Sequence, residues 1–459
     1  KGGVGKVFEY TGPGVSTLNV SERAQIADMG AETGATSSIF PSDEATLAWL
    51  RAFKREGDYQ PLAADEGAAY DELIEIDLSA LEPLVAMPSS PDKVVSISEV
   101  AGTPIQQVMI GSCTNTAHQD LVSAANILKG EKVNDRVNLG IYPSSATVVK
   151  AIASDGTLTN LLTAGARVFE PSCGGCNGCG FAPATQSVSL RTTPRNFAGR
   201  SGTYDDQVYL CGPEVAAASA VTGVITDPRT LGKTWTTYQL PEQFDISPHD
   251  FLDPSAQPDE IIKGPNIRPI PEFAAMPAKL DMPVVLKAGD NISTDIICPA
   301  GANYLPIRSN IPEISKFSYQ LVDKTFHDRA MNTPGSILVA GENYGQGSSR
   351  EQAAIIPRYL GVQTILAKSF ARLHLANLVN WGILPLTFQD PADWERIQQG
   401  DVLSIADTAQ LNAQEDVTLY NLTRGEKYTC RLPIFQEDVE SIRQGGTVNQ
   451  IREKLKNEA

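Results

Sequence analysis

Three cysteines with two residues between neighbours stand out as a possible metal-binding stretch. They are Cys173, Cys176 and Cys179, and glycine fills most of the positions between them. Glycine lets a backbone turn tightly and point its N–H groups at sulfur atoms. A further cysteine, Cys113, lies 60 residues upstream in the hexapeptide GSCTNT. We interpret Cys113, Cys173 and Cys176 as thiolate ligands of an iron–sulfur cluster.

Two kinds of metal site fit these thiols. A cluster held by three cysteines leaves one iron open, and an open iron acts as a Lewis acid on a hydroxyl or carboxylate. The alternative is a structural zinc ion bound by four sulfurs, with Cys179 as the fourth ligand. Zinc ribbons normally use two separate CxxC pairs, whereas Cys113 is isolated. The spacing favours the cluster and leaves zinc open.

Charged side chains that can recognise carboxylates follow the cysteines. The loop RTTPRNFAGRSG carries Arg191, Arg195 and Arg200. A guanidinium matches a carboxylate bidentately, although surface ion pairs are the common alternative for such a loop. Beside a metal motif, we expect Arg195 and Arg200 to bind a carboxylate. Glu32 lies in a loop of small residues where it can approach a ligand, although most loop glutamates are simply solvated.

A pair of serines after a glycine-rich turn allows two interpretations. Ser348-x-x-Glu351 and Ser349-x-x-Gln352 both match helix capping boxes. Alternatively, helix amides and Arg350 stabilise a serine alkoxide that removes a carbon-bound proton. The local sequence favours capping and leaves catalysis open.

The composition is that of a globular chain of 459 residues with 42% hydrophobic residues. No apolar run approaches the roughly 20 residues of a membrane helix. A net charge of −17 argues against nucleic acid as the main partner. Seven unevenly spaced cysteines argue against a disulfide scaffold and for a reducing compartment. We expect a cytoplasmic protein, with the mitochondrial matrix as the alternative.

The elements that must position the cysteines form a strand–helix alternation over residues 93–232. The β-branched residues predict strands at 94–100 and 106–110. Cys113 follows the second strand, and we expect a helix from Ala117 onward. Cys113 therefore lies at a strand-to-helix junction, where helix amides favour the thiolate. The carboxyl ends of parallel strands meet at one edge of a sheet. Cys113 and Cys173 are therefore expected at that edge.

Four motifs, GSCTNT, CGGC, RNFAGR and YGQGSSRE, occur in this order and resemble the aconitase family of iron–sulfur hydro-lyases. The resemblance covers nearly the whole chain and implies an α/β fold, with a three-layer α/β iron–sulfur domain and a C-terminal β/α swivel domain. The family's first domain has no counterpart here, so we expect a fragment of a longer aconitase. The implied divisions are 1–90 (remainder of the second α/β domain), 91–235 (third domain, with the cluster cysteines), 236–283 (Pro-rich linker) and 284–459 (swivel domain).

The resemblance also implies a role for individual residues. A [4Fe-4S] cluster is carried onto Cys113, Cys173 and Cys176, and Ser348 becomes the catalytic base. The implied substrate-binding residues are Glu32, Arg195, Arg200, Arg308, Ser349 and Arg350.

Several positions depart from the family pattern. Asp28 and Pro194 stand where the family has asparagines near the cluster, so we expect the hydrogen bonding around the cluster to differ. Gly175 replaces the proline of the usual CGPC, and Cys179 is an additional thiol.

The implied reaction is the dehydration of citrate to cis-aconitate and its rehydration to isocitrate, a step of the tricarboxylic acid cycle. The implied partner is a small tricarboxylate, and we expect a monomer or a chain that needs the missing N-terminal domain. One alternative is a related dehydratase acting on homoaconitate, 2-methylisocitrate or 3-isopropylmalate. Others are an inactive cluster-binding fragment and an iron-responsive RNA-binding protein, against which the acidity argues.

Overall fold

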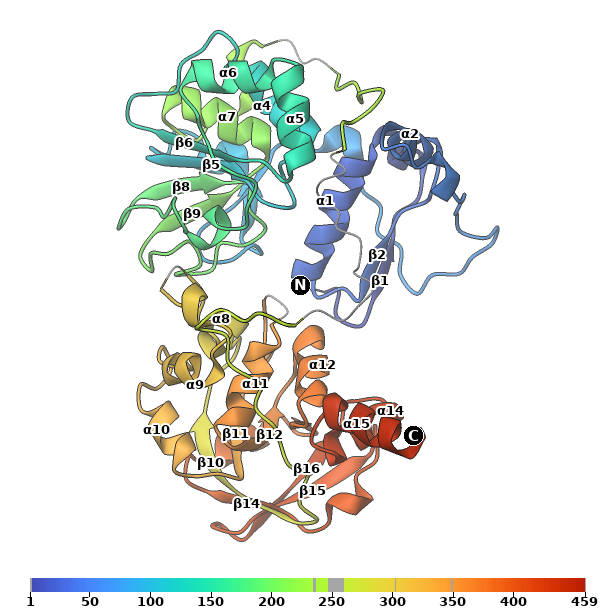
Figure 1. The fold of residues 1–459 in the computed structure, drawn as a ribbon, viewed down its shortest axis with the longest axis vertical. Helices are drawn as coiled ribbons and strands as arrows, with labels where there is room; N and C mark the ends of the chain where they lie inside the picture. The colour runs from blue at the N-terminus through green and yellow to red at the C-terminus, as the bar shows by residue number, and fades with distance from the viewer. Residues whose placement is uncertain (1, 234–236, 247–259, 302, 348–349, 459) are drawn as a thin grey trace. The chain divides into compact units, whose positions relative to one another are not determined.

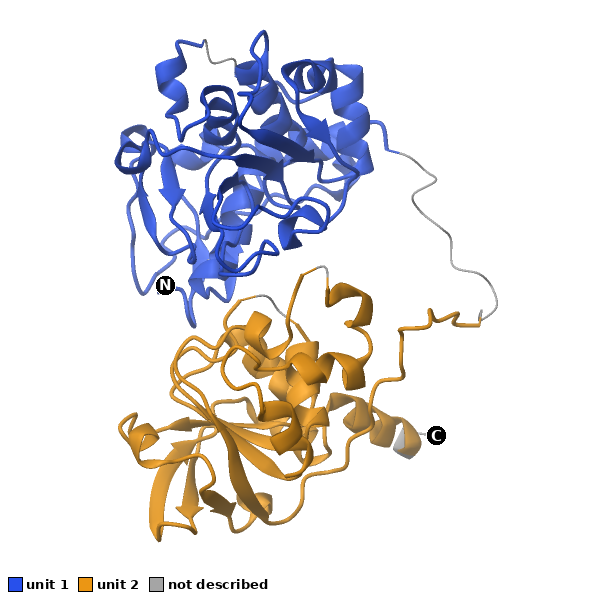
Figure 2. Cartoon of the chain, turned by 90° about the vertical axis from the view of Figure 1, so that its left-hand side faces the viewer, with its two compact units in different colours: residues 1–259 blue, residues 260–459 orange. Residues whose placement is uncertain are grey.

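The computed structural model describes residues 2–233, 237–246, 260–301, 303–347 and 350–458. They separate into two compact units, residues 1–259 (unit 1) and residues 260–459 (unit 2), as Figure 2 shows. The division between the units falls inside the predicted Pro-rich segment 236–283. The predicted boundary at residue 90, within unit 1, stays a prediction.

A mostly parallel sheet forms the centre of unit 1, and its described strands follow the order β4-β3-β9-β8-β5-β6-β7 (Figure 1). Strands β5 to β9 pair in parallel, whereas β3 pairs antiparallel with β4 and β9. The strands are β3 (Leu84–Ala86), β4 (Val94–Ser96), β5 (Gln107–Gly111), β6 (Asn138–Tyr142), β7 (Arg167–Val168), β8 (Val188–Arg191) and β9 (Gln207–Leu210).

Helices cover one face of this sheet in Figure 1, and the cysteine-bearing segment covers the other. Side chains of a strand alternate between faces. Val108 and Ile110 of β5 therefore join the helix-side core, while Met109 packs with Tyr142 and Phe181 on the opposite face. The helices are α4 (His118–Leu128), α5 (Ala146–Ser154), α6 (Thr157–Ala164) and α7 (Pro213–Thr222).

One local prediction differs from the structure, and another is confirmed. The strand expected at 94–100 ends at Ser96, because Ser96 and Glu99 form a capping box that begins the short helix α3 (Ile97–Val100). The helix expected from Ala117 is confirmed, because α4 begins at His118 with Ala117 as its N-cap.

The first residues of unit 1 form a parallel pair, β1 (Val7–Glu9) and β2 (Ser37–Ile39), beside helix α1 (Val20–Gly30). Asn19 and Glu22 cap α1 reciprocally. The side chain of Gln25 donates to both carboxylate oxygens of Asp120 on α4, at 2.8 and 2.9 Å. These contacts hold α1, and the short helix η2 (Ala31–Thr33) after it, against the start of α4. The remaining helix near this pair is α2 (Glu44–Ala52).

Unit 2 is built on a closed barrel, whose described strands follow the order β10-β11-β12-β13-β16-β15-β14. Strands β10 to β13 are parallel neighbours, and the other pairings are antiparallel. In β11, Ile337 and Val339 belong to one core, while Leu338 and Ala340 belong to the core shared with α11. The strands are β10 (Leu280–Lys287), β11 (Ser336–Ala340), β12 (Val362–Ala367), β13 (Leu384–Phe388), β14 (Val402–Ile405), β15 (Asp416–Asn421) and β16 (Glu426–Arg431).

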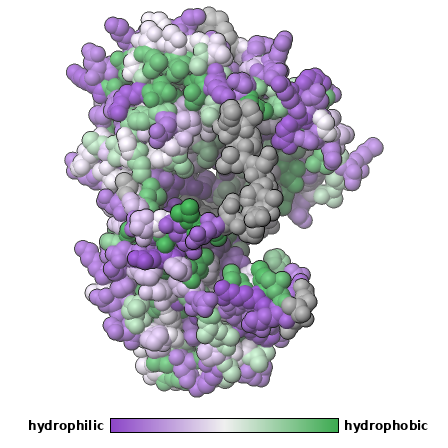
Figure 3. All heavy atoms as spheres, viewed as in Figure 1, coloured by the Kyte–Doolittle hydropathy of each residue, from purple (hydrophilic) through white to green (hydrophobic). Residues whose placement is uncertain are grey.

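The predicted α/β class is confirmed in both units. The charged C-terminal segment forms two helices, α14 (Gln436–Arg443) and α15 (Thr447–Glu458), which are divided at Gly445 and Gly446. Figure 3 shows a mixed face, with smaller hydrophobic areas among hydrophilic side chains. Among the described residues, none of the helices has the length and apolar character to cross a membrane. The helices of unit 2 are α8 (Thr294–Ile297), α9 (Ile311–Ile314), α10 (Phe326–Met331), α11 (Gln352–Tyr359), α12 (Arg372–Asn380), α13 (Asp393–Arg396), α14 (Gln436–Arg443) and α15 (Thr447–Glu458).

Candidate active site

The structure brings the three predicted ligand cysteines into one neighbourhood of unit 1. Cys113 lies between β5 and α4, and Cys173 and Cys176 lie on the loop that follows β7. Cys176 is 4% exposed, whereas Cys113 and Cys173 are exposed. Burial raises the pKa of the Cys173 thiol, and the charges of Cys176 and Cys113 raise it further. The three sulfurs are thus close enough to interact electrostatically.

A cluster and a single metal ion place different demands on these thiols. Within the described ranges, no three His, Cys, Asp or Glu side chains converge closely enough to hold one metal ion. Structural zinc needs four ligands at bonding distance from one centre. A four-iron cluster is larger and binds each cysteine through a different iron, so its ligand sulfurs lie farther apart.

The side chain of Arg191 is hydrogen-bonded to the backbone of the cysteine loop. Its guanidinium is fully buried and donates to the carbonyls of Gly175, at 2.9 Å, and Phe181, at 2.8 Å. It also donates to Gln107 Oε1 at 2.9 Å. Burial lowers the pKa of Arg191 to about 10, so the side chain keeps its charge at neutral pH. Arg191 ends β8 and faces away from the helix-side residue Leu190, an alternation already visible in the sequence.

Arg195, Arg200 and Glu32 lie beside the thiols. Arg200 Nη2 lies 3.6 Å from the sulfur of Cys176. Arg195 Nη2 and Glu32 Oε1 form an ion pair at 2.6 Å. Both arginines lower the pKa of Cys173, and so favour its thiolate. The structure therefore groups the predicted carboxylate-binding residues of unit 1 with the predicted metal ligands.

Buried polar groups in this cluster remain available to a ligand. Arg195 Nε is buried and has no hydrogen-bond partner within the described structure. Burial raises the pKa of Glu32, and Arg195 opposes that rise. A carboxylate entering beside Arg195 would supply the missing acceptor.

A hydrogen bond links Asp28 of α1 to Thr114, the residue directly after Cys113. Thr114 Oγ1 donates to Asp28 Oδ2 at 2.6 Å, and the same oxygen lies 3.8 Å from Cys113 Sγ. Sequence reasoning identified Asp28 as a departure from the family but missed Thr114. Its position directly after Cys113 in GSCTNT was the available signal.

The packing around Gly175 explains why glycine stands at this position instead of the family's proline. A Cβ at this position would lie 2.7 Å from the ring of Tyr142 and 2.7 Å from Met109 Cε. The Tyr142 ring is itself stacked on Phe169, with centroids 4.3 Å apart. A proline at position 175 would require this packing to change.

The predicted residues of unit 2 form a separate group. Arg350 pairs with Asp295 at 2.6 Å and donates to the Cys298 carbonyl at 3.0 Å. Arg350 and Arg308 both lower the pKa of the Cys298 thiol against the larger, opposite effect of burial. Ser348 and Ser349 lie outside the described residues.

The predicted capping boxes of the serine motif do not begin helix α11. Helix α11 begins at Gln352, with Glu351 as its N-cap. The Glu351 carboxylate accepts from Asn380 Nδ2 at 3.3 Å and from Trp381 Nε1. Glu351 is thus bound to the end of α12, where a different pocket begins.

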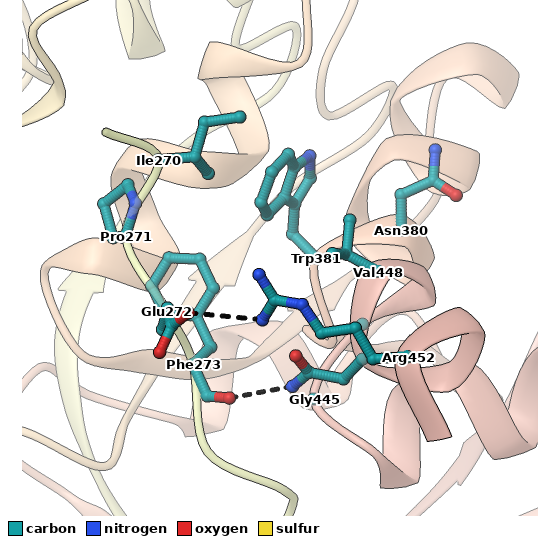
Figure 4. A pocket seen from close by; sticks show the side chains of 11 residues that line it. Ile270, Pro271, Glu272, Phe273, Asn380, Trp381, Gly445, Val448 and Arg452 are labelled. Atoms are coloured by element: carbon teal, nitrogen blue, oxygen red, sulfur yellow. Dashed lines mark hydrogen bonds and ion pairs between the residues drawn. The ribbon is translucent and has the colours of Figure 1, made fainter. Parts of the chain in front are cut away.

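That pocket holds about 110 Å³ and lies between residues 270–273, the end of α12 and the start of α15 (Figure 4). Trp381, Phe273 and Val448 line it, and Glu272 pairs with Arg452 at 3.4 Å. It contains none of the predicted site residues.

Comparisons with known proteins show the family of the chain. A family model described as the aconitase family (aconitate hydratase) matches residues 1–104 and 98–223. A model of the aconitase C-terminal domain matches residues 312–391. The match over residues 98–223 contains Cys113, Cys173, Cys176 and the arginine loop, and the match over residues 312–391 contains Arg350.

Individual relatives match along nearly the whole chain. A putative mitochondrial aconitate hydratase of Aspergillus fumigatus is 33% identical, with 94% of this chain and 63% of the relative aligned. The mitochondrial aconitate hydratase of Gracilaria gracilis is 31% identical, with 98% and 67% aligned. A mitochondrial homocitrate dehydratase of Saccharomyces cerevisiae is 30% identical, with 100% and 68% aligned. The chain therefore spans about two thirds of the length of these relatives. From the family models, these relatives and the grouped motifs, we conclude that the chain belongs to the aconitase family.

Proposed function

We propose that this chain carries the cluster site and part of the substrate site of a hydro-lyase that interconverts citrate and isocitrate through cis-aconitate. The observation that supports this proposal most is the grouping, within unit 1, of three thiols with two arginines and a buried carboxyl group. Those residues are Cys113, Cys173, Cys176, Arg195, Arg200 and Glu32.

In this proposal, Cys113, Cys173 and Cys176 hold a [4Fe-4S] cluster. The cluster would supply a Lewis-acidic iron toward the substrate's hydroxyl and carboxylate. Arg200 places a guanidinium N–H toward the Cys176 sulfur, at 3.6 Å. A nearby positive charge stabilises the thiolate that iron binding requires.

Arg195 and Glu32 would bind and orient one end of the substrate. Glu32 holds one nitrogen of the Arg195 guanidinium, which leaves the buried Nε free to donate. A guanidinium with one fixed side and one open donor recognises a carboxylate in a single orientation. Arg200, only 7% exposed, adds a second positive charge to the same neighbourhood. A tricarboxylate substrate carries three negative charges, which complement the positive charges of the two arginines.

Dehydration removes a proton from one carbon and hydroxide from its neighbour. We propose Ser348 Oγ as the acceptor of that proton, with Ser349, Arg350 and Arg308 binding substrate. Asp295 and the Cys298 carbonyl fix the guanidinium of Arg350 near the serine motif. The proposal requires the unit 2 residues to reach the unit 1 site during turnover.

A related dehydratase is the alternative within the same chemistry. The homocitrate dehydratase relative is 30% identical to this chain, almost the same as the 31% of one aconitate hydratase. Homoaconitate, 2-methylisocitrate and 3-isopropylmalate are therefore included as substrates to be tested. An inactive cluster-binding fragment is the other alternative, because the chain spans only about two thirds of its relatives.

The cellular location of the chain is proposed from the names of its relatives. The names of the relatives place those proteins in mitochondria. We propose the mitochondrial matrix or the cytoplasm, and fractionation of the source cells would separate the two.

The first test measures iron and acid-labile sulfide per chain after anaerobic reconstitution. We expect roughly four of each, as a cubane requires. Cys113→Ala, Cys173→Ala and Cys176→Ala should each lose most of both, whereas Cys430→Ala, a buried thiol of unit 2, should not. Zinc without sulfide in the wild-type chain would overturn the assignment.

Substrate identity needs a second test on chains that carry the cluster. Hydration and dehydration rates with citrate, isocitrate, homoaconitate, 2-methylisocitrate and 3-isopropylmalate distinguish the candidates. A clear preference for citrate and isocitrate supports the proposal. Bound cluster without turnover on any of these acids supports the inactive fragment.

A further inference from the structure

The carboxylate of Asp28 accepts a hydrogen bond from a threonine hydroxyl that lies beside the Cys113 sulfur. Thr114 Oγ1 lies 2.6 Å from Asp28 Oδ2 and 3.8 Å from Cys113 Sγ. A hydroxyl has one proton to donate, and an ionised carboxylate can only accept. The Thr114 proton is therefore directed at Asp28, and the oxygen presents only lone pairs toward the sulfur.

Both partners of this hydrogen bond are held in place. The Thr114 side chain is buried, and its backbone N–H donates to Ser112 Oγ at 3.1 Å. Thr116 Oγ1 donates to the Ser112 carbonyl at 2.6 Å, which closes the turn. On the other side, α1 is fastened to α4 through Gln25. The Asp28–Thr114 contact is thus a built feature of the turn that carries Cys113.

An amide at position 28 would change the direction of the proton. Asparagine can donate through its NH₂ group, and then the Thr114 oxygen accepts. The Thr114 proton becomes available to the Cys113 sulfur. Cys176, by contrast, already faces a donor, because Arg200 Nη2 lies 3.6 Å from its sulfur.

Hydrogen bonds to ligand sulfurs and the local net charge both set the reduction potential of an iron–sulfur cluster. Resting on the proposed function, we propose that Asp28 is a positioning residue that acts through Thr114 on Cys113. By withholding a hydrogen bond from this one sulfur, Asp28 lowers the reduction potential of the bound cluster.

The test is a redox titration, followed by electron paramagnetic resonance, of the full chain after reconstitution. Asp28→Asn should shift the potential to a more positive value at unchanged iron and sulfide content. Asp28→Ala frees the same proton without introducing an amide, and should shift the potential in the same direction. Asp65→Asn, which removes one negative charge from an exposed loop, is the control and should leave the potential unchanged.

The route through Thr114 is tested separately. In a Thr114→Val background no hydroxyl proton remains to be redirected, so Asp28→Asn should shift the potential less than in the wild-type background. Equal shifts in both backgrounds would mean that Asp28 acts by charge alone and would overturn the inference. No shift in either Asp28 variant would also overturn it.

The same experiment separates this inference from the proposed function. A wild-type chain that binds no iron and sulfide overturns both. A wild-type chain with a full cluster whose potential ignores Asp28 overturns only the inference. Thermal unfolding of each variant checks that α1 remains folded.

Discussion

The buried guanidinium of Arg191 fixes the backbone on which two of the cysteines lie. Replacing it with methionine would remove the charged donor from the carbonyls of Gly175 and Phe181, which keep only the Gly178 N–H at 3.1 Å and Gln107 Nε2 at 3.4 Å. We expect Arg191→Met to lower the free energy of unfolding of unit 1 by about 3 kcal/mol, since hydrogen bonds from a buried charged donor are lost. Urea unfolding measures this loss. Arg229→Met, at a half-exposed arginine paired with Asp227, should cost less than about 1 kcal/mol.

Gly175 has a neighbour that makes a matched comparison possible. A Cβ at Gly175 would lie 2.7 Å from Tyr142 and Met109, whereas a Cβ at Gly174 would meet its nearest atom at 3.4 Å. We therefore expect Gly175→Ala to cost about 1–3 kcal/mol and to reduce cluster occupancy, because overpacking displaces the loop. Gly174→Ala should change little. Equal losses in the two variants would contradict the packing explanation.

Sequence patterns predicted which residues gather but not how they pair. Cys113, Cys173, Cys176, Arg195 and Glu32 were all identified from motifs, and unit 1 brings them together. The pairing of Arg195 with Glu32 could not be predicted, because both were expected to face substrate. It depends on the docking of α1 against the start of α4, which no local pattern encodes.

Helix α1 carries Asp28 to the cysteines, and the short helix η2 directly after it carries Glu32. Asp120 is the attachment point of α1 on α4. Burial raises the pKa of Asp120 to about 7 from an ordinary 3.8. Unfolded Asp120 loses its proton near pH 4, whereas the folded residue keeps it until about pH 7. The folded state thus binds more protons across this range, so this group makes stability fall as pH rises from about 4 to 7.

The titration of Asp120 lowers the free energy of unfolding by up to about 4 kcal/mol as pH rises from about 4. This loss is complete just above pH 7. Asp120→Asn cannot titrate, and a reoriented amide of Gln25 can still pair with it. We expect the variant to be more stable than wild type at pH 8 and to lose this part of the pH dependence. Urea unfolding between pH 4 and 8 provides the measurement. Parallel profiles for the two proteins would exclude Asp120 as the cause.

Element boundaries were harder to predict than element types. The run of β-branched residues from Val94 to Val100 reads as one strand, yet the capping box at Ser96 and Glu99 turns its second half into a helix. The helix predicted from Ala117 agrees with α4, which begins at His118. Side-chain capping decided where the strand ends, and the pair Ser96 and Glu99 was legible in the sequence.

The two units have independent cores. The core around β5 and its helices lies within residues 85–225, and the two cores of the barrel unit lie within residues 280–442. Each unit thus buries its own apolar surface, which is the main source of stability for a domain. We expect two separate transitions in calorimetry of the full chain, each reproduced when residues 1–259 or 260–459 are expressed alone. A single cooperative transition would contradict independence.

The same division separates the proposed chemistry between the units. All three proposed cluster ligands lie in unit 1, and the proposed base, Ser348, belongs to unit 2. Residues 1–259 alone should therefore assemble roughly four iron and four sulfide per chain. Residues 260–459 should assemble none, although they retain two cysteines. Neither part should turn over a tricarboxylate on its own, because metal site and base are then on different chains. Iron and sulfide analysis of each part, with turnover assays of each alone and of both mixed, checks this. Turnover by residues 1–259 alone would remove Ser348 from the reaction, whereas cluster assembly that requires both parts would place a ligand outside unit 1.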